Sequence, residues 1–266
     1  MCIIEFYGQE VSDMDYNALV QLGCELGVQL MRCGAEIYRV EDSIRRLMTA
    51  YGAPQPQVFA IPSCLIVSVS LADSQPITQV CRIPGHGIDL DRLEQCNALC
   101  RRLCRDTPSV EDARTQVQQL DAVCPRFSDP LVLFGHFLTG AAFTLFFRGT
   151  LADCLCGGLC GLLIALSTRF LRPIAGANAF FRTLLSAALS YLLAFSLVRA
   201  GVGAHTDIIS TGALMLLVPG VSLTTAMREV MAGDLVSGLS DLADSVLTAI
   251  AIALGTGAVM ALTAML

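Results

Sequence analysis

Residues 208–227 read IISTGALMLLVPGVSLTTAM, an uncharged run that lies between Asp207 and Arg228. A helix of about 20 residues is needed to cross the hydrocarbon core of a bilayer, and this run is long enough. Pro219 and Gly220 fall near its middle. Because proline removes an intrahelical hydrogen bond and clashes with the preceding turn, we expect a break or a kink in the helix there.

Four further runs with little or no charge accompany this one. They cover residues 131–147, 149–168, 183–198 and 245–266, and short charged stretches separate them. The two shorter runs, 131–147 and 183–198, can cross a bilayer if the flanking Arg side chains reach the interface. A soluble all-helical core is the alternative, but five successive runs of this length would be unusual for one. The sequence therefore predicts five transmembrane helices within residues 129–266.

Charge is concentrated in the first half of the chain. Residues 1–130 hold 17 of the 23 acidic and 11 of the 17 basic residues, all of them Arg, and residues 131–266 hold six of each sign. With 54% hydrophobic and 15% charged residues, the composition argues against a purely cytosolic globular protein. The net charge of -6 argues against a nucleic-acid partner, which requires clustered positive charge.

The positions of the Arg residues predict the orientation in the membrane. With the N-terminus in the cytoplasm, the outer loops carry only Arg148 and Arg199. The inner flanks then carry the larger set, Arg126, Arg169, Arg172, Arg182 and Arg228. Because positive charge is enriched on the cytoplasmic side, we expect a multi-pass protein of the cell (inner) membrane with its C-terminus outside. The opening MCIIEFYGQEVSDMD has no basic segment ahead of an apolar one, so no signal peptide is expected.

Residues 1–128 are predicted to form a small cytosolic α+β domain. Apolar residues step by three or four from Leu19 to Tyr51, which predicts one long amphipathic helix that ends at Gly52 and Pro54. Strands are predicted over 57–61, 64–72 and 77–83, the last two joined by the turn-like ADSQP. Helices near 89–105 and 109–123 follow. A regulatory or assembly module without chemistry of its own is one interpretation of this domain.

Polar residues near the predicted break are the first candidates for a substrate or ion pathway. In transporters, broken helices expose backbone carbonyls and half-helix ends at mid-membrane, where solutes bind; a packing kink without a ligand is the alternative. The candidates are Pro219, Gly220, Ser222, Thr224, Thr225, Arg228, Glu229, Asp234, Asp241 and Asp244. Charges at membrane depth often mark pathways, although at helix ends they are also simply interfacial.

Two more polar residues stand within the apolar runs. His136 is in the first run and Asp153 is near the start of the second. The histidine is a candidate proton relay and the carboxylate a candidate carrier of a coupling proton. The competing interpretation of His136 is a hydrogen bond to a backbone carbonyl near the interface.

Motifs for catalysis and metal binding are weak. There is no Ser-His-Asp order, phosphate-binding glycine loop or zinc motif, so neither a cofactor nor a metal is expected. His86 lies alone in a Gly-rich turn, and the Arg and Glu residues spaced along 32–46 fit ion pairs on a solvated face. The cysteines are interpreted as reduced or buried apolar residues, including the groups Cys96, Cys100, Cys104 and Cys154, Cys156, Cys160.

Two stretches carry a resemblance to a known family. CGAEIYRVEDSIRRL at 33–47 and LLVPGVSLTTAMREVMAGDLVSGLSD at 216–241 resemble the threonine/serine exporter family, in the order and spacing that the family shows. The family's first signature falls on Gly34, Ala35, Glu36, Arg39, Val40 and Glu41. Its later signatures fall on Pro219, Gly220, Gly233, Asp234, Ser237 and Gly238.

The resemblance implies a function. Members of the family are secondary transporters that export threonine and serine, and some two-subunit members resemble exporters of dicarboxylates such as succinate. It implies that this chain is the larger subunit and that a small, separately encoded membrane subunit completes a hetero-oligomer or homo-oligomer. The sequence therefore predicts a proton-driven exporter of small polar metabolites. Two alternatives stay open: a membrane-anchored enzyme with a catalytic cytosolic domain, and an assembly or sensory subunit that transports nothing.

Overall fold

The computed structural model describes residues 15–71, 75–83, 85, 87–123, 127–174 and 178–265. The chain forms two compact units. The first comprises Met1–Pro125 together with Met227–Ser240, and the second comprises Arg126–Ala226 together with Asp241–Leu266. His86 and Arg126 lie outside the described residues.

The first unit contains helices and one small sheet. Its elements are α1 (Tyr16–Arg32), α2 (Ile37–Ala50), β1 (Pro56–Ile61), β2 (Cys64–Val69), β3 (Ile77–Arg82), α3 (Leu90–Asp106) and α4 (Val110–Val123). The sheet is antiparallel in the order β1-β2-β3, with Val58 opposite Val67 and Val67 opposite Gln79. The predicted α+β class, the three strands and the two helices after them are confirmed.

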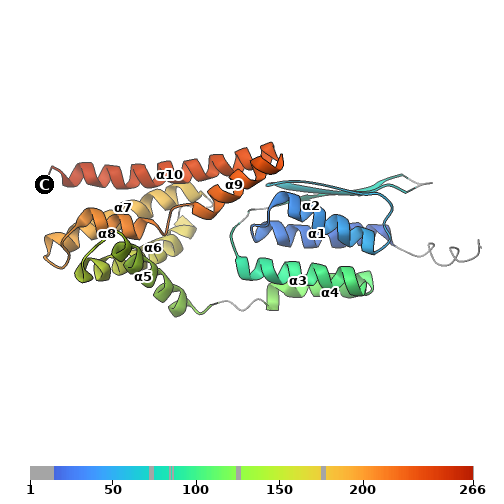
Figure 1. The fold of residues 1–266 in the computed structure, drawn as a ribbon, viewed down its shortest axis with the longest axis horizontal. Coiled ribbons are helices and arrows are strands. Elements are labelled where there is room, and N and C mark those ends of the chain that lie inside the picture. The colour runs from blue at the N-terminus through green and yellow to red at the C-terminus, as the bar shows by residue number, and fades with distance from the viewer. Residues whose placement is uncertain are drawn as a thin grey trace, which may run out of the picture. The chain divides into compact units, whose positions relative to one another are not determined.

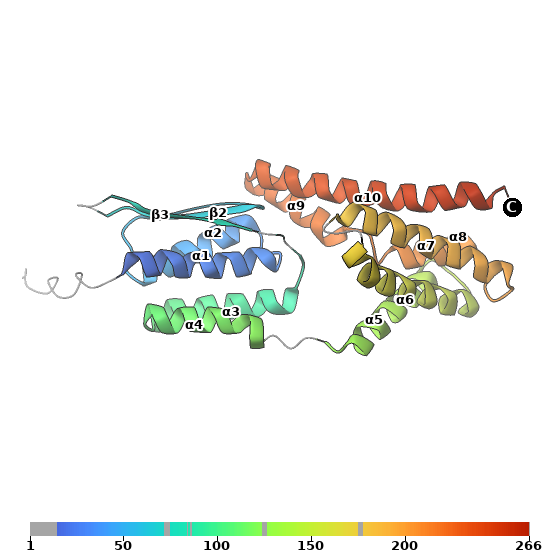
Figure 2. The same cartoon turned by 180° about the vertical axis from the view of Figure 1, so that it is seen from behind.

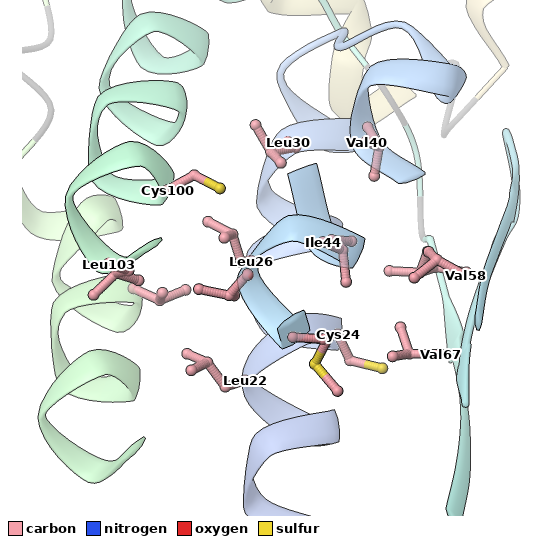
Figure 3. Packing of buried hydrophobic residues seen from close by; sticks show 14 of the residues in the cluster. Leu22, Cys24, Leu26, Leu30, Val40, Ile44, Val58, Val67, Cys100 and Leu103 are labelled. Carbon is pink, nitrogen blue, oxygen red and sulfur yellow. The ribbon is translucent and has the colours of Figure 1, made fainter. Parts of the chain in front are cut away.

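Three layers build the first unit (Figures 1 and 2): the sheet, then α1 and α2, then α3 and α4. Since α1 lies in the middle layer, it is buried on both sides. Leu22 and Leu26 face Leu103 of α3, and Cys24 faces Val67 of β2 (Figure 3). Continuous burial of this kind explains why the apolar positions of α1 exceed a single stripe.

The single long helix predicted from Leu19 to Tyr51 is wrong, because the chain turns between α1 and α2. Gly34 has a φ of +86°, and the amides of Gly34 and Ala35 donate to the carbonyls of Met31 and Leu30, 3.1 Å each. These two bonds form a Schellman motif, which ends a helix at a left-handed residue. A Cβ at Gly34 would also lie 2.6 Å from the carbonyl oxygen of Gly87. The signature glycine therefore ends α1.

The remaining helices belong wholly or partly to the second unit. They are α5 (Asp129–Phe146), α6 (Leu151–Ile174), α7 (Ala179–Arg199), α8 (Thr206–Leu214), α9 (Gly220–Ala232) and α10 (Leu235–Thr263). Four stretches of helix among the described residues are long and apolar enough to cross a membrane: Asp129–Phe146, Leu151–Leu171, Ala179–Arg199 and Leu235–Thr263. The run at 208–227 is divided between α8 and α9, so four of the five predicted spans are found as continuous helices among the described residues.

The second unit exposes large apolar side chains and buries mostly small residues. Large apolar side chains point outward along its helices, including Phe146, Leu151 and Leu262, which are 75%, 81% and 63% exposed. The buried residues include small apolar ones such as Cys160, Ala187 and Ala194. They also include the small polar residues Thr144, Ser167, Ser186, Ser190, Ser210 and Ser245. The hydroxyl of Ser167 on α6 donates to that of Ser186 on α7 over 2.9 Å. This distribution is the one expected of helices that lipid surrounds.

Glycines let α5, α6 and α8 approach one another closely. A Cβ at Gly161 of α6 would lie 2.4 Å from the carbonyl oxygen of His136 on α5. At Gly212 of α8, a Cβ would lie 2.6 Å from the amide nitrogen of Thr144. Small residues at such contacts are typical of helix packing in membranes.

Substituting one of these glycines should loosen the second unit. Gly161→Ala is expected to lower the free energy of unfolding by about 1–3 kcal/mol, because backbone atoms of α5 cannot move aside as a side chain can. Gly257→Ala on α10 is the matched control, since a Cβ there meets nothing within 4 Å. Thermal loss of helical circular dichroism in detergent measures both. Equal melting of the two variants would contradict the close packing.

Candidate functional site

Two sequence stretches that carry the family resemblance meet in the first unit. The Glu36 side chain is the common partner: Arg228 Nη1 donates to its Oε1, and Arg39 Nε lies 2.6 Å from its Oε2. Beside this pair, the amide of Ile37 donates to Glu229 Oε1 over 3.1 Å. We call Glu36, Arg39, Arg228 and Glu229 the signature cluster.

Glu229 supplies the cap that α2 lacks. Glu36 occupies the position before the helix but makes no side-chain bond to the first-turn amides. The carboxylate of Glu229 takes that role from a distant segment, and negative charge is favourable at the positive end of a helix. Glu229 is 1% exposed and Glu36 is 7% exposed. Because buried carboxylates require partners, these bonds hold the last turns of α9 at the start of α2.

Glu41 and Asp234 add to the acidic surroundings of α2. Glu41 Oε1 accepts the amide of Ala60 on β1 over 2.8 Å. Burial raises the pKa of Glu41 above its usual value, and the negative charge of Asp234 raises it further. Both residues belong to the family signatures. The structure therefore places residues from the two signatures within electrostatic range of each other.

The raised pKa of Glu41 predicts a pH effect on stability. A carboxyl whose pKa is higher in the folded than in the unfolded chain makes the fold less stable as the pH rises from the ordinary value, 4.5, to the raised value. As the pH rises just above 4.5, the melting temperature of Glu41→Gln should therefore fall less steeply than that of the wild type. The exposed Glu94→Gln is the control with the same change in net charge. Parallel pH curves for wild type and Glu41→Gln would contradict this assignment.

The predicted break at Pro219 is confirmed. The helix α8 ends at Leu214 and α9 begins at Gly220, with the turn between them closed by the Leu217 amide on the Leu214 carbonyl at 2.8 Å. The first helical bond after the break runs from the Leu223 amide to the Pro219 carbonyl, 3.0 Å. Ser222, Thr224 and Thr225 then lie in the first turns of α9.

Asp153 forms the second cluster of interactions, at the start of α6. Its Oδ2 accepts the amide and the hydroxyl of Thr150, at 3.0 and 2.9 Å, and the Thr150 hydroxyl accepts the Asp153 amide at 3.2 Å. This reciprocal pair is a capping box. Its Oδ1 accepts the amides of Ala204 and His205 ahead of α8, at 2.7 and 3.2 Å. The buried carboxylate thus joins the starts of α6 and α8.

His205 completes this cluster and was not singled out from the sequence. Its Nδ1 lies 2.9 Å from Asp153 Oδ2, and its side chain is 50% exposed whereas that of Asp153 is 0% exposed. The spacing Thr-x-x-Asp ahead of an apolar run was a signal for the capping box. No local pattern connects His205 to a residue 52 positions earlier.

The other candidates make more local interactions. His136 Nδ1 lies 2.8 Å from the Val132 carbonyl oxygen, which supports the carbonyl-bonded interpretation over the proton relay. Asp244 is exposed on α10, and its backbone carbonyl accepts the Thr248 hydroxyl. Asp241 lies one turn earlier, where its carbonyl accepts the Ser245 hydroxyl. The structure therefore places His136, Asp241 and Asp244 apart from the signature cluster, the break and the Asp153 cluster.

Comparison with protein families assigns the chain to one family. The sequence model of the ThrE family, described as "Putative threonine/serine exporter", matches residues 21–263. The chain belongs to the ThrE family. The match covers both ThrE signature stretches, the break and the Asp153 cluster.

Curated relatives of this ThrE chain come from bacteria and yeast. A Mycobacterium tuberculosis protein named "Probable threonine/serine exporter" is 22% identical over 92% of this chain and 46% of its own length. An uncharacterized Schizosaccharomyces pombe protein is 24% identical over 88% of this chain and 29% of its own length. The chain therefore spans less than half the length of either relative. No solved structure matches it.

Proposed function

We propose that this ThrE chain is the membrane subunit of a secondary exporter of small polar metabolites, either threonine and serine or dicarboxylates such as succinate. The observation that carries the proposal is the break between α8 and α9 inside a unit whose outer surface is apolar. Half-helix ends at such a break expose backbone groups that can bind a carboxylate or an ammonium group of the solute.

In this proposal α8 and α9 together make one discontinuous crossing, beside α5, α6, α7 and α10. The connection between α9 and α10 groups with the first unit, which supports placing that connection on the side of the cytosolic domain. The C-terminus is then outside. A phosphatase that folds only outside the cytoplasm, fused after Leu266, is expected to be active; an inactive fusion, with an active fusion at the α9–α10 connection, would reverse the orientation.

The expected result of the functional test is export. Cells that lack redundant exporters, loaded with threonine, serine or succinate, should lose at least one of these solutes faster when they express the chain. Unchanged efflux of all three on expression and on deletion of the gene would refute the proposal. An enzymatic activity in the isolated residues 1–125, without efflux, would favour the membrane-anchored enzyme.

The break itself predicts a matched pair of proline variants. Pro219→Ala removes the residue that prevents a continuous helix, because proline is about 3 kcal/mol less favourable than alanine inside a helix. The variant is expected to lower efflux at least about tenfold. Pro130→Ala is the control, because Pro130 stands in the first turn of α5, where proline is tolerated. Equal efflux from the two variants would show that the break is a packing feature only.

The second membrane subunit is also part of the proposal and rests on the family resemblance. Purification of the tagged chain from its native membrane in mild detergent is expected to recover a small apolar protein in a fixed ratio. Recovery of an active exporter that contains this chain alone would remove the partner from the proposal.

A further inference from the structure

The pair formed by His205 and Asp153 has the geometry of a proton-binding site. Asp153 is buried and holds Nδ1 of the imidazole at 2.9 Å, while half of the His205 side chain is exposed. A carboxylate that accepts from Nδ1 fixes the tautomer and the orientation of the ring. The other ring nitrogen, Nε2, is then the atom that can take up or release a proton.

Chain connectivity places this pair at one end of the second unit. Since α5, α6 and α7 run in alternating directions, α6 and α8 start at the same end, and the bonds from Asp153 to Ala204 and His205 show that these starts are adjacent. The α9–α10 connection is at the other end of the crossings. In the proposed orientation the pair therefore faces the outside, from which a driving proton would come.

We propose that His205 Nε2 is the atom that binds the coupling proton at the outer mouth of the exporter. This inference rests on the proposed export function and names the ion site for it. An external proton binds Nε2, so that the ring becomes an imidazolium paired with the ionised Asp153, and the same proton leaves Nε2 for water when the carrier has turned inward. On binding, an O–H bond of hydronium breaks as the N–H bond forms, and on release the N–H bond breaks as an O–H bond to water forms.

The other charged or titratable groups on the adjoining elements are few. Asp207 stands in the first turn of α8. Arg148 stands in the connection before α6, and Arg199 is the last residue of α7. The thiols of Cys154 and Cys156 lie close enough to Asp153 to interact with its charge. Of these described groups, His205 is the one histidine, a residue type that serves as a proton shuttle in proteins.

The variant that tests this role is His205→Asn. The amide nitrogen of Asn can stand where Nδ1 stands, so the variant retains a donor to Asp153 and lacks Nε2. Asp207→Asn, in the first turn of α8, is the control that removes one exposed carboxylate without touching the pair. Both variants leave the four other hydrogen bonds of the Asp153 side chain in place.

The experiment compares two transport modes in right-side-out membrane vesicles that contain the full chain and are loaded with serine, threonine or succinate. Exchange of labelled for unlabelled solute requires no net proton movement, whereas efflux driven by an acid-outside gradient does. In His205→Asn, the rate of gradient-driven efflux should fall at least about tenfold, which is less than the rate effect of about 100-fold or more that positioned proton-transfer groups have. The rate of solute exchange should stay the same. Asp207→Asn should keep both.

The outcomes separate the two proposals. Equal driven efflux in His205→Asn and wild type would overturn the role of His205 and leave the export function standing. Loss of both modes in His205→Asn would also overturn it, because the pair would then be structural. Absence of any exchange in the wild type would overturn the export function, and the ion site with it.

Discussion

Asp153→Ala is expected to destabilise the second unit more than any other single change named here. The side chain of Asp153 accepts five hydrogen bonds while fully buried, and three of the donors are backbone amides that no other described group is placed to satisfy. Removing a buried hydrogen-bonded charge costs about 3–5 kcal/mol, and a native protein has only about 5–15 kcal/mol in total. Melting of the purified protein in detergent measures the loss.

Two further variants serve as controls for the loss of stability in Asp153→Ala. Asp153→Asn retains one acceptor oxygen and should fall between alanine and the wild type. Asp207→Ala removes an exposed carboxylate from the first turn of α8 and should cost only about 0.3–1 kcal/mol. If Asp153→Ala and Asp207→Ala had the same melting temperature, the stability of the starts of α6 and α8 would not depend on Asp153.

Glu229→Ala is expected to release the start of α2. Among the described residues, Glu229 is the only one whose side chain accepts a hydrogen bond from the Ile37 amide. The change also removes the buried carboxylate beside the pair of Glu36 and Arg228. The expected cost is about 1–3 kcal/mol for an unsatisfied buried donor. Hydrogen exchange followed by mass spectrometry should therefore become faster in peptides from residues 34–47.

Controls for Glu229 follow from the geometry. Glu229→Gln still offers an amide oxygen to Ile37 and should protect the peptides more than alanine does. Asp42→Ala breaks the exposed ion pair with Arg46, whose side chains are 49% and 74% exposed, and should cost less than about 1 kcal/mol. Unchanged exchange in Glu229→Ala would show that the cap does not hold α2.

The sequence predicted the elements that local patterns determine. Proline at 219 removes a helical donor wherever it stands, so the break could be predicted from one residue, and alternation of apolar residues predicted β1, β2 and β3. The turn at Gly34 was missed because the apolar step of three or four residues continues across it. Only the left-handed conformation and the nearby Gly87 carbonyl show why α1 must end there.

Contacts between distant residues could not be predicted in the same way. Glu36 and Arg228 are 192 positions apart, and the ladder spacing of Arg32, Glu36 and Arg39 suggested pairs within one helix. The pair of Glu36 with Arg39 is present, but Arg228 shares the same carboxylate. His205 likewise becomes a candidate only through its contact with the buried Asp153, and no spacing in the sequence indicates that contact.

The course of α9 has a mechanical consequence. It is one uninterrupted helix from Gly220 to Ala232, whose first residues belong to the second unit and whose last residues, with Arg228 and Glu229, belong to the first. A helix of this length is about 20 Å long and stiff, so a rotation at Pro219 must also displace Glu229. In the proposed exporter, α9 would therefore carry a movement at the break to the first turn of α2.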